Sequence, residues 1–336
     1  MTGSVLLTGG FGNIGGRFAA FLTEEHGVDI KLATRRNRPA PPWAPTANVS
    51  VCDLNNLSSL KQACEGVGTV FHFAALNDRE CARDPGRAHV VNVDGTANLL
   101  DAALSTGVSH IVYMSTIHVY GAPLVGHLTE NSATRPTHPY GVTHLAAERI
   151  LHGSSTKIRS TIIRSGNGFG YPMSFDVDIW HIIVNDLCMQ AVRDQRLVLK
   201  SPANSQRNFV TLRDICRALH FVGLAQPTSE SSITFNLGSR MSRSLRQIAN
   251  LVADRCDHVF GYRPEIFESV LETSAETSLQ FDCSRLLQAG FSTEELFDDE
   301  IDGILKLVAA NLGRRNVPHG MGIGHHSYFQ SGRLLA

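Results

Sequence analysis

Short apolar runs alternate with longer amphipathic stretches along the first half of this chain. The runs have the length of buried strands, and the stretches between them repeat apolar side chains at helical spacing. Strands are predicted at 4–8, 29–34, 48–53, 69–75, 110–116 and 160–166. Helices are predicted at 12–27, 92–107 and 138–150. Because strands that alternate with helices imply right-handed crossovers, the pattern predicts an α/β fold with a doubly wound parallel sheet.

The pattern loosens after about residue 170. Helices are predicted at 178–192, 244–255 and 292–313, and short strands at 196–199, 207–211 and 233–238. Ser292 and Glu295 predict a capping box for the last helix. We expect residues 1–170 to form the doubly wound domain and residues 171–313 mainly a smaller C-terminal α/β lobe. The Gly- and His-rich tail, residues 314–336, is expected to be flexible or to form an arm on a neighbouring subunit, because its histidines lack an ordered scaffold for a metal.

Composition and charge exclude several classes of protein. The chain has 336 residues, of which 43% are hydrophobic and 18% charged, as in a globular protein. A net charge of −1 favours neither nucleic acid nor an anionic membrane as a partner. No apolar run has the length of a membrane span, and the first residues lack the basic region of a signal peptide. Seven cysteines without a CxxC pair fit reduced thiols, so we expect a cytoplasmic protein without a metal site.

The first candidate for chemistry is a glycine-rich turn. Gly9, Gly12 and Gly15 have the spacing GxxGxxG, between the first predicted strand and the first predicted helix. A tight turn there lets backbone N–H groups approach a pyrophosphate, and the helix N-terminus adds positive potential. The position of the motif predicts a dinucleotide-binding domain.

The end of the second predicted strand bears on which dinucleotide binds. A carboxylate at this position would bind the ribose 2′-hydroxyl of NAD, but the chain has Thr34 followed by Arg35 and Arg36. Guanidinium groups without a carboxylate suit the 2′-phosphate of NADP, so NADP is the predicted cofactor and NAD the alternative. The arginines could also be merely solvated. Asp53, at the end of the third strand, is expected near the adenine amino group or at the cap of the next helix.

Six motifs in order carry a resemblance to a known family. TGGFGNIG, CDL, HFAAL, VVNVDGT, STIHVYG and YGVTH occur at the spacing of the extended short-chain dehydrogenase/reductase family. More narrowly, the chain resembles its sugar-nucleotide epimerase/dehydratase branch, over nearly residues 3–290. The resemblance implies a Rossmann-type fold, NAD(P), a nucleoside-diphosphate sugar as substrate, and a homodimer joined through long helices.

The same resemblance implies roles for individual residues. Thr116 would hydrogen-bond the reacting sugar oxygen, and Tyr140 would be the acid/base that moves the hydroxyl proton. Substrate phosphates would lie near Asn167 and Arg207, although an arginine can equally be solvated. The implied cofactor contacts are Gly9, Phe11, Gly12, Asn13, Ile14 and Gly15 at the pyrophosphate, Asp53 and Leu54 at the adenine, and Ala74, Ala75, Leu76, Asn92 and Ser165 along the remainder.

Two departures from the family pattern affect the expected chemistry. Dehydratases carry Asp and Glu after the hydroxyl residue, whereas this chain has Ile117 and His118, so dehydration is disfavoured. His118 could transfer a proton at a carbon beside a ketone, or could only shape the pocket.

His144 replaces the lysine expected four residues after Tyr140, on the same helical face. We expect it to donate a hydrogen bond to the cofactor ribose and to become an imidazolium when Tyr140 ionises; a weakly used or structural cofactor is the alternative.

These observations predict an NAD(P)-dependent enzyme that epimerises a nucleoside-diphosphate sugar through a transient ketone. One route oxidises C4 and returns hydride to the other face, and the other uses His118 to invert a neighbouring carbon. An NADPH-dependent 4-ketoreductase is the second expectation. A cofactor-binding scaffold or sensor is the third, motivated by His144.

Overall fold

The computed structural model describes residues 4–25, 27–226, 230–269 and 278–313. The predicted tail at 314–336 lies outside the described residues. A sheet of seven strands, all parallel, forms the centre of the larger lobe, in the order β12-β7-β5-β4-β1-β2-β3. Its strands are β1 (Ser4–Thr8), β2 (Ile30–Thr34), β3 (Asn48–Val51), β4 (Val67–His72), β5 (His110–Thr116), β7 (Arg159–Ser165) and β12 (Ser232–Leu237).

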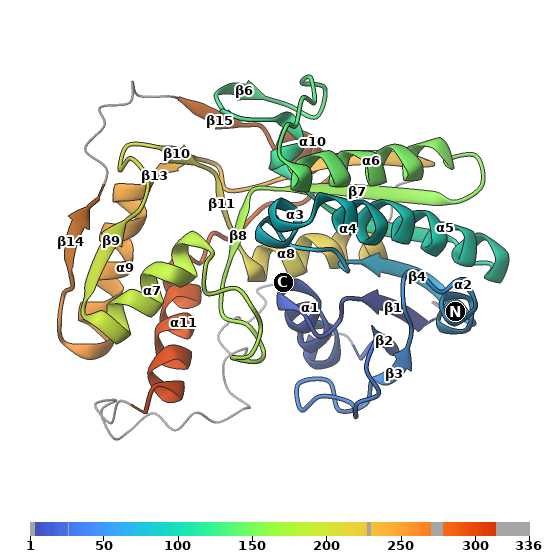
Figure 1. The fold of residues 1–336 in the computed structure, drawn as a ribbon, viewed down its shortest axis with the longest axis horizontal. Coiled ribbons are helices and arrows are strands. Elements are labelled where there is room, and N and C mark those ends of the chain that lie inside the picture. The colour runs from blue at the N-terminus through green and yellow to red at the C-terminus, as the bar shows by residue number, and fades with distance from the viewer. Residues whose placement is uncertain (1–3, 26, 227–229, 270–277, 314–336) are drawn as a thin grey trace.

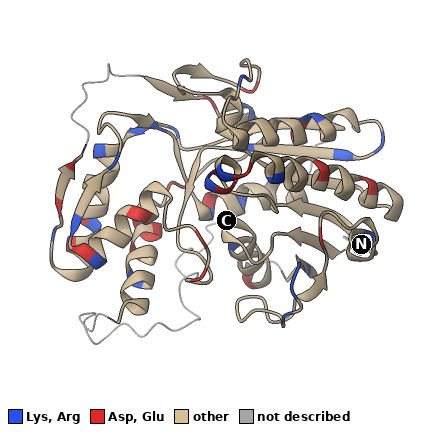
Figure 2. Ribbon diagram, viewed as in Figure 1, with Lys and Arg blue, Asp and Glu red and all other residues tan. Residues whose placement is uncertain are grey.

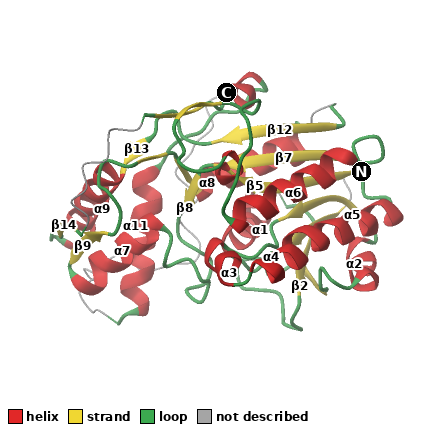
Figure 3. Ribbon diagram, turned by 45° about the horizontal axis from the view of Figure 1, so that its top comes forward, coloured by secondary structure: helices red, strands yellow, loops and turns green. Residues whose placement is uncertain are grey.

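Helices cover both faces of this sheet (Figures 1 and 3). One face packs against α1 (Asn13–Glu25) and α8 (Leu212–His220), through side chains such as Phe18 and Leu219. The other face packs against α2 (Leu57–Cys64), α5 (Gly95–Thr106) and α6 (Pro139–Gly153), through Leu60, Leu99 and Leu151. The predicted Rossmann-type α/β fold is confirmed. Shorter helical segments are α3 (Asp78–Arg83), α4 (Pro85–Ala88), η1 (His89–Asp94), η2 (Ile117–Tyr120) and η3 (Phe221–Ala225).

A second lobe packs around three helices with their own apolar cluster. They are α7 (Ile183–Asp194), α9 (Leu245–Phe260) and α11 (Phe297–Asn311), and α10 (Ser284–Gln288) lies between the last two in sequence. Four two-stranded pairs complete the described strands: β9 (Arg196–Leu199) with β14 (Glu265–Glu268), β10 (Gln206–Arg207) with β13 (Arg243–Ser244), β8 (Asn167–Phe169) with β11 (Phe209–Thr211), and β6 (Gly126–Leu128) with β15 (Leu279–Phe281). Because α8 and β12 belong to the larger lobe, the chain after residue 170 contributes to both lobes; the proposed boundary stays a prediction.

The predicted start of the last helix is wrong. The helix begins at Phe297, and no side chain caps it. Backbone N–H groups of Glu294 and Glu295 instead donate to the carboxylate of Asp214 in α8. Glu295 has a φ of 56°, which is incompatible with the helix that a Ser292 capping box requires. The helix predicted from residue 178 likewise begins later, at Ile183, because Trp180 belongs to a turn in which its ring packs on Phe175.

A buried ion pair joins the two lobes. Arg17 of α1 donates to Glu300 of α11 through two nitrogens, at 2.7 and 3.0 Å. The same carboxylate accepts the backbone N–H groups of Tyr171 and Arg213. The side chains of Arg17 and Glu300 are only 4% and 3% exposed, so each group depends on the other to compensate its charge.

Candidate functional site

The predicted site residues gather at the carboxyl edge of the main sheet. Strands β1, β2, β4, β5 and β7 are parallel neighbours, so their carboxyl ends share this edge. The chain runs outward from β1 to β3 and then returns to β4 on the other side of β1, which creates a topological switch point. In doubly wound sheets, ligands bind in the crevice beside such a point.

The glycine turn after β1 is packed without space for side chains. The carbonyl of Gly9 accepts the N–H of Gly12 at 2.8 Å. A Cβ on Gly15 would lie 2.3 Å from the carbonyl oxygen of Gly9, so any side chain there would push α1 away from the turn. Asn13 begins α1, and its Oδ1 is buried without a hydrogen-bond partner among the described residues. The turn and the first residues of the helix, which include Phe11 and Ile14, therefore form a preorganised cradle with one unused acceptor.

Basic residues follow β2, as Figure 2 shows. Arg35 and Arg36 are exposed, and the Thr34 hydroxyl accepts the N–H of Arg36 at 3.2 Å. The guanidinium of Arg38 lies 4.0 Å from the ring centroid of Phe11, and so against the glycine turn. Sequence reasoning missed Arg38, since nothing in the local pattern distinguishes it from a solvated arginine.

The predicted adenine residues lie after β3. The Asp53 carboxylate accepts the N–H of Asn55 at 2.9 Å. The predicted capping of the next helix by Asp53 is wrong, because Asn56 caps α2 by accepting the N–H of Ser59. The backbone carbonyl of Leu54 accepts from Asn98 of α5 at 2.9 Å, and the Leu54 side chain is buried. Contacts of both residues with adenine stay a prediction.

Asn92 holds together the loop after β4. Its Oδ1 accepts the N–H of Leu76 at 2.8 Å, and its amide nitrogen donates to the hydroxyl of Thr143 at 3.0 Å. The N–H of Ala74 donates to the Thr8 hydroxyl at the end of β1. Asn92 thus fixes the segment of Ala74, Ala75 and Leu76 relative to α6.

Thr116 and Tyr140 meet where β5 ends and α6 begins. Burial raises the pKa of Tyr140 to about 12, and a side-chain hydrogen bond with Thr116 opposes this rise. The Thr116 hydroxyl also accepts the N–H of His118, which starts η2. A Cβ on Gly141 would lie 2.6 Å from the carbonyl oxygen of His118, so α6 approaches η2 directly. Gly141 therefore allows the contact that brings Tyr140 to Thr116.

Buried polar contacts anchor the rest of α6. Glu148 accepts from Arg164 of β7 at 2.7 Å and from the hydroxyl of Ser115 in β5. Both charged side chains are buried, and their pairing fixes α6 along two strands of the sheet. The face of α6 that carries Tyr140 and His144 is held against β5 in this way.

His118 is an exposed residue beside Tyr140. The two ring centroids are 6.1 Å apart. Desolvation and the nearby charge of Arg207 lower the pKa of His118, and the charge of Asp78 opposes this. Its predicted part in proton transfer stays a prediction.

The environment of His144 favours a neutral ring in the resting protein; the imidazolium expected when Tyr140 ionises stays a prediction. The residue is 3% exposed, and burial lowers its pKa to about 3. Its ring centroid lies 4.5 Å from that of Tyr140, and its Nδ1 lies 2.7 Å from the hydroxyl of Tyr113. The Nε2 atom has no hydrogen-bond partner among the described residues. A neutral ring therefore occupies the lysine position. Tyr113 was missed because it stands in an apolar strand pattern.

The remaining predicted residues line the sheet edge toward the second lobe. Ser165 ends β7, and its hydroxyl donates to the carbonyl of Gly166. The amide nitrogen of Asn167 donates to the carbonyl of Asn208 at 2.9 Å, so this donor is already engaged. Arg207 is partly buried, and burial lowers its pKa. Its Nη1 donates to the carbonyl of Gln206 at 3.0 Å. Within the described ranges no carboxylate pairs with Arg207, so its other nitrogens are available to an anion.

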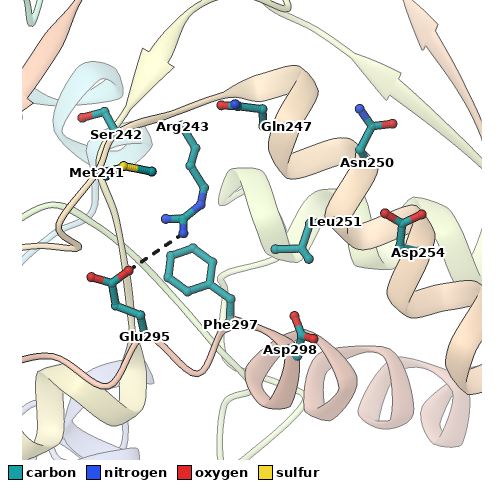
Figure 4. Close-up of a pocket in the computed structure, with 10 residues that line it drawn as sticks. All are labelled: Met241, Ser242, Arg243, Gln247, Asn250, Leu251, Asp254, Glu295, Phe297 and Asp298. Atoms are coloured by element: carbon teal, nitrogen blue, oxygen red, sulfur yellow. Dashed lines mark ion pairs between the residues drawn. The ribbon is translucent and has the colours of Figure 1, made fainter.

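A separate hollow of about 500 Å³ opens at the start of α9 and α11 in the second lobe (Figure 4). Arg243 lies 3.9 Å from Glu295, and its guanidinium lies 4.3 Å from the ring centroid of Phe297. Asp254 and Asp298 lie on the opposite wall. None of the predicted site residues lines this hollow.

Comparisons with known proteins agree with the motifs. A model of the NAD dependent epimerase/dehydratase family matches residues 5–238. The UDP-glucose 4-epimerase of Streptomyces lividans is 26% identical over 269 residues, which cover 75% of this chain and 80% of that protein.

Two solved structures share the fold over most of the chain. MoeE5 in complex with UDP-glucose and NAD has a TM-score of 0.76 at 24% identity, covering 92% of this chain and 100% of that one. RMD from Pseudomonas aeruginosa, complexed with NADPH, has a TM-score of 0.73 at 23% identity, covering 92% of this chain and 99% of that one. The predicted resemblance is confirmed.

Proposed function

This chain belongs to the NAD dependent epimerase/dehydratase family of enzymes, and we propose that it epimerises C4 of a nucleoside-diphosphate hexose through a transient ketone. The observation that carries the proposal is the contact of Thr116 with Tyr140 at the carboxyl edge of β5. A hydroxyl and a phenol at this point supply a hydrogen-bond donor and a proton carrier for one sugar oxygen.

The residues present fit a nicotinamide dinucleotide. The glycine cradle cannot take a Cβ at Gly15, while Asn13 Oδ1 and His144 Nε2 are buried polar atoms without partners in the described part of the protein. Buried polar atoms are rarely left unpaired, so ligand atoms are the natural partners for both. When bound, such a cofactor would take a hydride from the sugar carbon and return it.

Tyr140 would take the proton of the C4 hydroxyl and later give it back. Its pKa of about 12 means that the phenol keeps its proton at pH 7, and His144 supplies no positive charge to lower that pKa. Turnover should therefore rise with pH between 7 and 9. His144→Lys restores a cation four residues along the helix and should raise turnover most at the lower end of this range. A pH–rate profile that is flat in both proteins would contradict this reasoning.

NADP is the proposed cofactor and NAD the alternative. Exposed Arg35 and Arg36 after a strand that ends in threonine support NADP, and Arg38 adds a third guanidinium on Phe11. The similar proteins are divided, since MoeE5 was solved with NAD and RMD with NADPH. Arg35→Ala should weaken NADP binding about tenfold and leave NAD unchanged, measured by calorimetric titration. A preference for NAD that the substitution does not alter would contradict the assignment.

A UDP-hexose is the proposed substrate, because the Streptomyces lividans relative is a UDP-glucose 4-epimerase and MoeE5 was solved with UDP-glucose. Arg207, without a carboxylate partner among the described residues, would pair with the diphosphate. Asn167 stays a proposed neighbour of the phosphates. A homodimer through α6 is also proposed, supported by exposed Val90 and Val142 on η1 and α6. A cytoplasmic location completes the proposal.

The experiment is direct: UDP-glucose is incubated with the protein and with NADP or NAD, and the sugar product is identified by NMR. The C4 epimer is expected, and Tyr140→Phe should lower its formation about 10²–10⁴-fold while nucleotide binding persists. Wild-type protein that binds a dinucleotide but changes no sugar nucleotide would favour a scaffold instead.

A ketoreductase is the second candidate, favoured by the arginines that suit NADPH. It would consume NADPH in stoichiometric amounts with a 4-keto sugar nucleotide, whereas an epimerase recycles its cofactor. Incubation with such a ketone and measurement of NADPH consumed per product separate the two.

A further inference from the structure

We propose that Tyr113 fixes His144 in the tautomer that carries its proton on Nε2, so that His144 presents one N–H donor where the resembling enzymes present a lysine. Tyr113 is thus a positioning residue, which acts through His144. The acceptor that we assign, a ribose hydroxyl of the dinucleotide, rests on the proposed function.

The pair is formed by two buried side chains on packed elements. Tyr113 lies in the middle of β5 and is 2% exposed, and His144 lies in α6 and is 3% exposed. The Tyr113 hydroxyl and His144 Nδ1 are 2.7 Å apart, the distance of a well-formed hydrogen bond. Glu148, one turn further along α6, holds that helix on β5 and keeps the two rings in register.

The hydroxyl hydrogen decides the direction of this bond. Among the described residues, the Tyr113 hydroxyl has His144 Nδ1 as its one hydrogen-bond partner. If His144 donated instead, the phenolic hydrogen would be buried without an acceptor, which is costly. Tyr113 therefore donates, and its pKa, raised well above the usual range by burial, keeps the proton on the oxygen. A neutral imidazole that accepts at Nδ1 carries its hydrogen on Nε2.

The Nε2 donor then needs an acceptor that the described protein does not provide. It is buried without a partner, although the Tyr140 ring is its neighbour. The nearby imidazole of His72 is already engaged at both nitrogens, with the hydroxyls of Thr8 and Thr96. Because His144 follows the proposed acid/base by one helical turn, its free N–H lies on the same face of α6 as Tyr140.

The tautomer can be measured in the protein without ligand, by ¹⁵N chemical shifts of the His144 ring. Wild type should show a protonated Nε2 and an accepting Nδ1. Tyr113→Phe, which removes only the donor, should shift His144 toward the other tautomer. Tyr120→Phe is the control, since it also deletes a buried hydroxyl but one that contacts Asn236 and Arg164. A wild-type ring protonated on Nδ1, or one that Tyr113→Phe leaves unchanged, would overturn the inference.

A binding cycle tests whether Tyr113 acts through His144. His144→Gln carries an amide N–H near the position of Nε2 and has no tautomer to fix. Tyr113→Phe should weaken dinucleotide binding about tenfold in the wild-type background, the worth of one hydrogen bond, and hardly at all in the His144→Gln background. Equal losses in both backgrounds would overturn the inference, because they would indicate a packing effect. If the ring is protonated on Nε2 but the protein binds neither NAD nor NADP, the proposed function and the assigned acceptor are contradicted. If the ring is protonated on Nδ1, only the positioning role of Tyr113 is contradicted.

Discussion

Arg17→Met should destabilise the protein far more than the loss of an ordinary arginine. Arg17 is the cation of the buried pair between α1 and α11. Its loss would leave the Glu300 carboxylate buried with two backbone N–H donors among the described residues. Methionine keeps the apolar length of the side chain, so the substitution removes mainly the charge.

The expected size of this effect follows from the burial of both side chains. Removal of one partner from a buried ion pair costs about 3–5 kcal/mol, since the other charge stays desolvated. The double variant Arg17→Met/Glu300→Gln removes that charge. The N–H groups of Tyr171 and Arg213 donate to different oxygens of Glu300, so the single amide oxygen of Gln keeps one of these two hydrogen bonds. The double variant should therefore be more stable than Arg17→Met alone, by about 2 kcal/mol.

Urea unfolding followed by tryptophan fluorescence measures these differences, and Arg193→Met is the matched control. Arg193 lies in a helix, pairs with Asp194, and has a side chain that is 57% exposed. Its replacement should therefore change the free energy of unfolding by less than about 1 kcal/mol. Equal losses in Arg17→Met and Arg193→Met, or a double variant less stable than Arg17→Met, would refute the reasoning.

Two further predictions concern the site and the core. Gly141→Ala should reduce turnover about 10²-fold, because its Cβ would lie 2.6 Å from the His118 carbonyl oxygen and move Tyr140 from Thr116; Gly153→Ala, with open space on the same helix, should be neutral in the same steady-state assay. Burial lowers the pKa of His110 to about 3, so this histidine stabilises the fold while neutral, above about pH 6.5, and loses that stabilisation as the pH falls. When the pH falls from 7 to 5, the free energy of unfolding should fall in both proteins, and the fall should be about 2 kcal/mol smaller in His110→Gln than in wild type. Urea titrations at pH 7 and at pH 5 measure this, and an equal fall in the two proteins would contradict the prediction.

The sequence predicted the larger lobe well because its strands are short, apolar and punctuated by glycine. All seven strands of the main sheet overlap segments predicted from hydrophobic pattern. The glycine turn was predicted from its place between the first strand and the first helix, whereas Thr116 and Tyr140 were implied by the family resemblance. Helix starts were predicted less well: Glu295 failed as a cap because Asp214, distant in sequence, captures the local N–H groups.

Side-chain electrostatics could not be predicted from local pattern. The residue type of His144 suggested a charge that could appear on demand, but its pKa depends on burial by elements that only the fold brings together. Tyr113 and Arg38 were missed for a related reason, because their partners, His144 and Phe11, lie on other elements. The Arg17–Glu300 pair spans nearly the whole chain, and single-residue patterns carry no information on such a pairing.

The fate of hydrogen at the inverted carbon tests the central claim most directly. UDP-glucose that carries deuterium at C4 is converted in ordinary water, and the product is analysed by NMR. If C4 is oxidised and reduced again within one site, with Tyr140 moving only the hydroxyl proton, the epimer should retain its deuterium at C4. Loss of that deuterium to solvent, or solvent deuterium entering a neighbouring carbon when the reaction runs in D₂O, would contradict the account and favour proton transfer through His118.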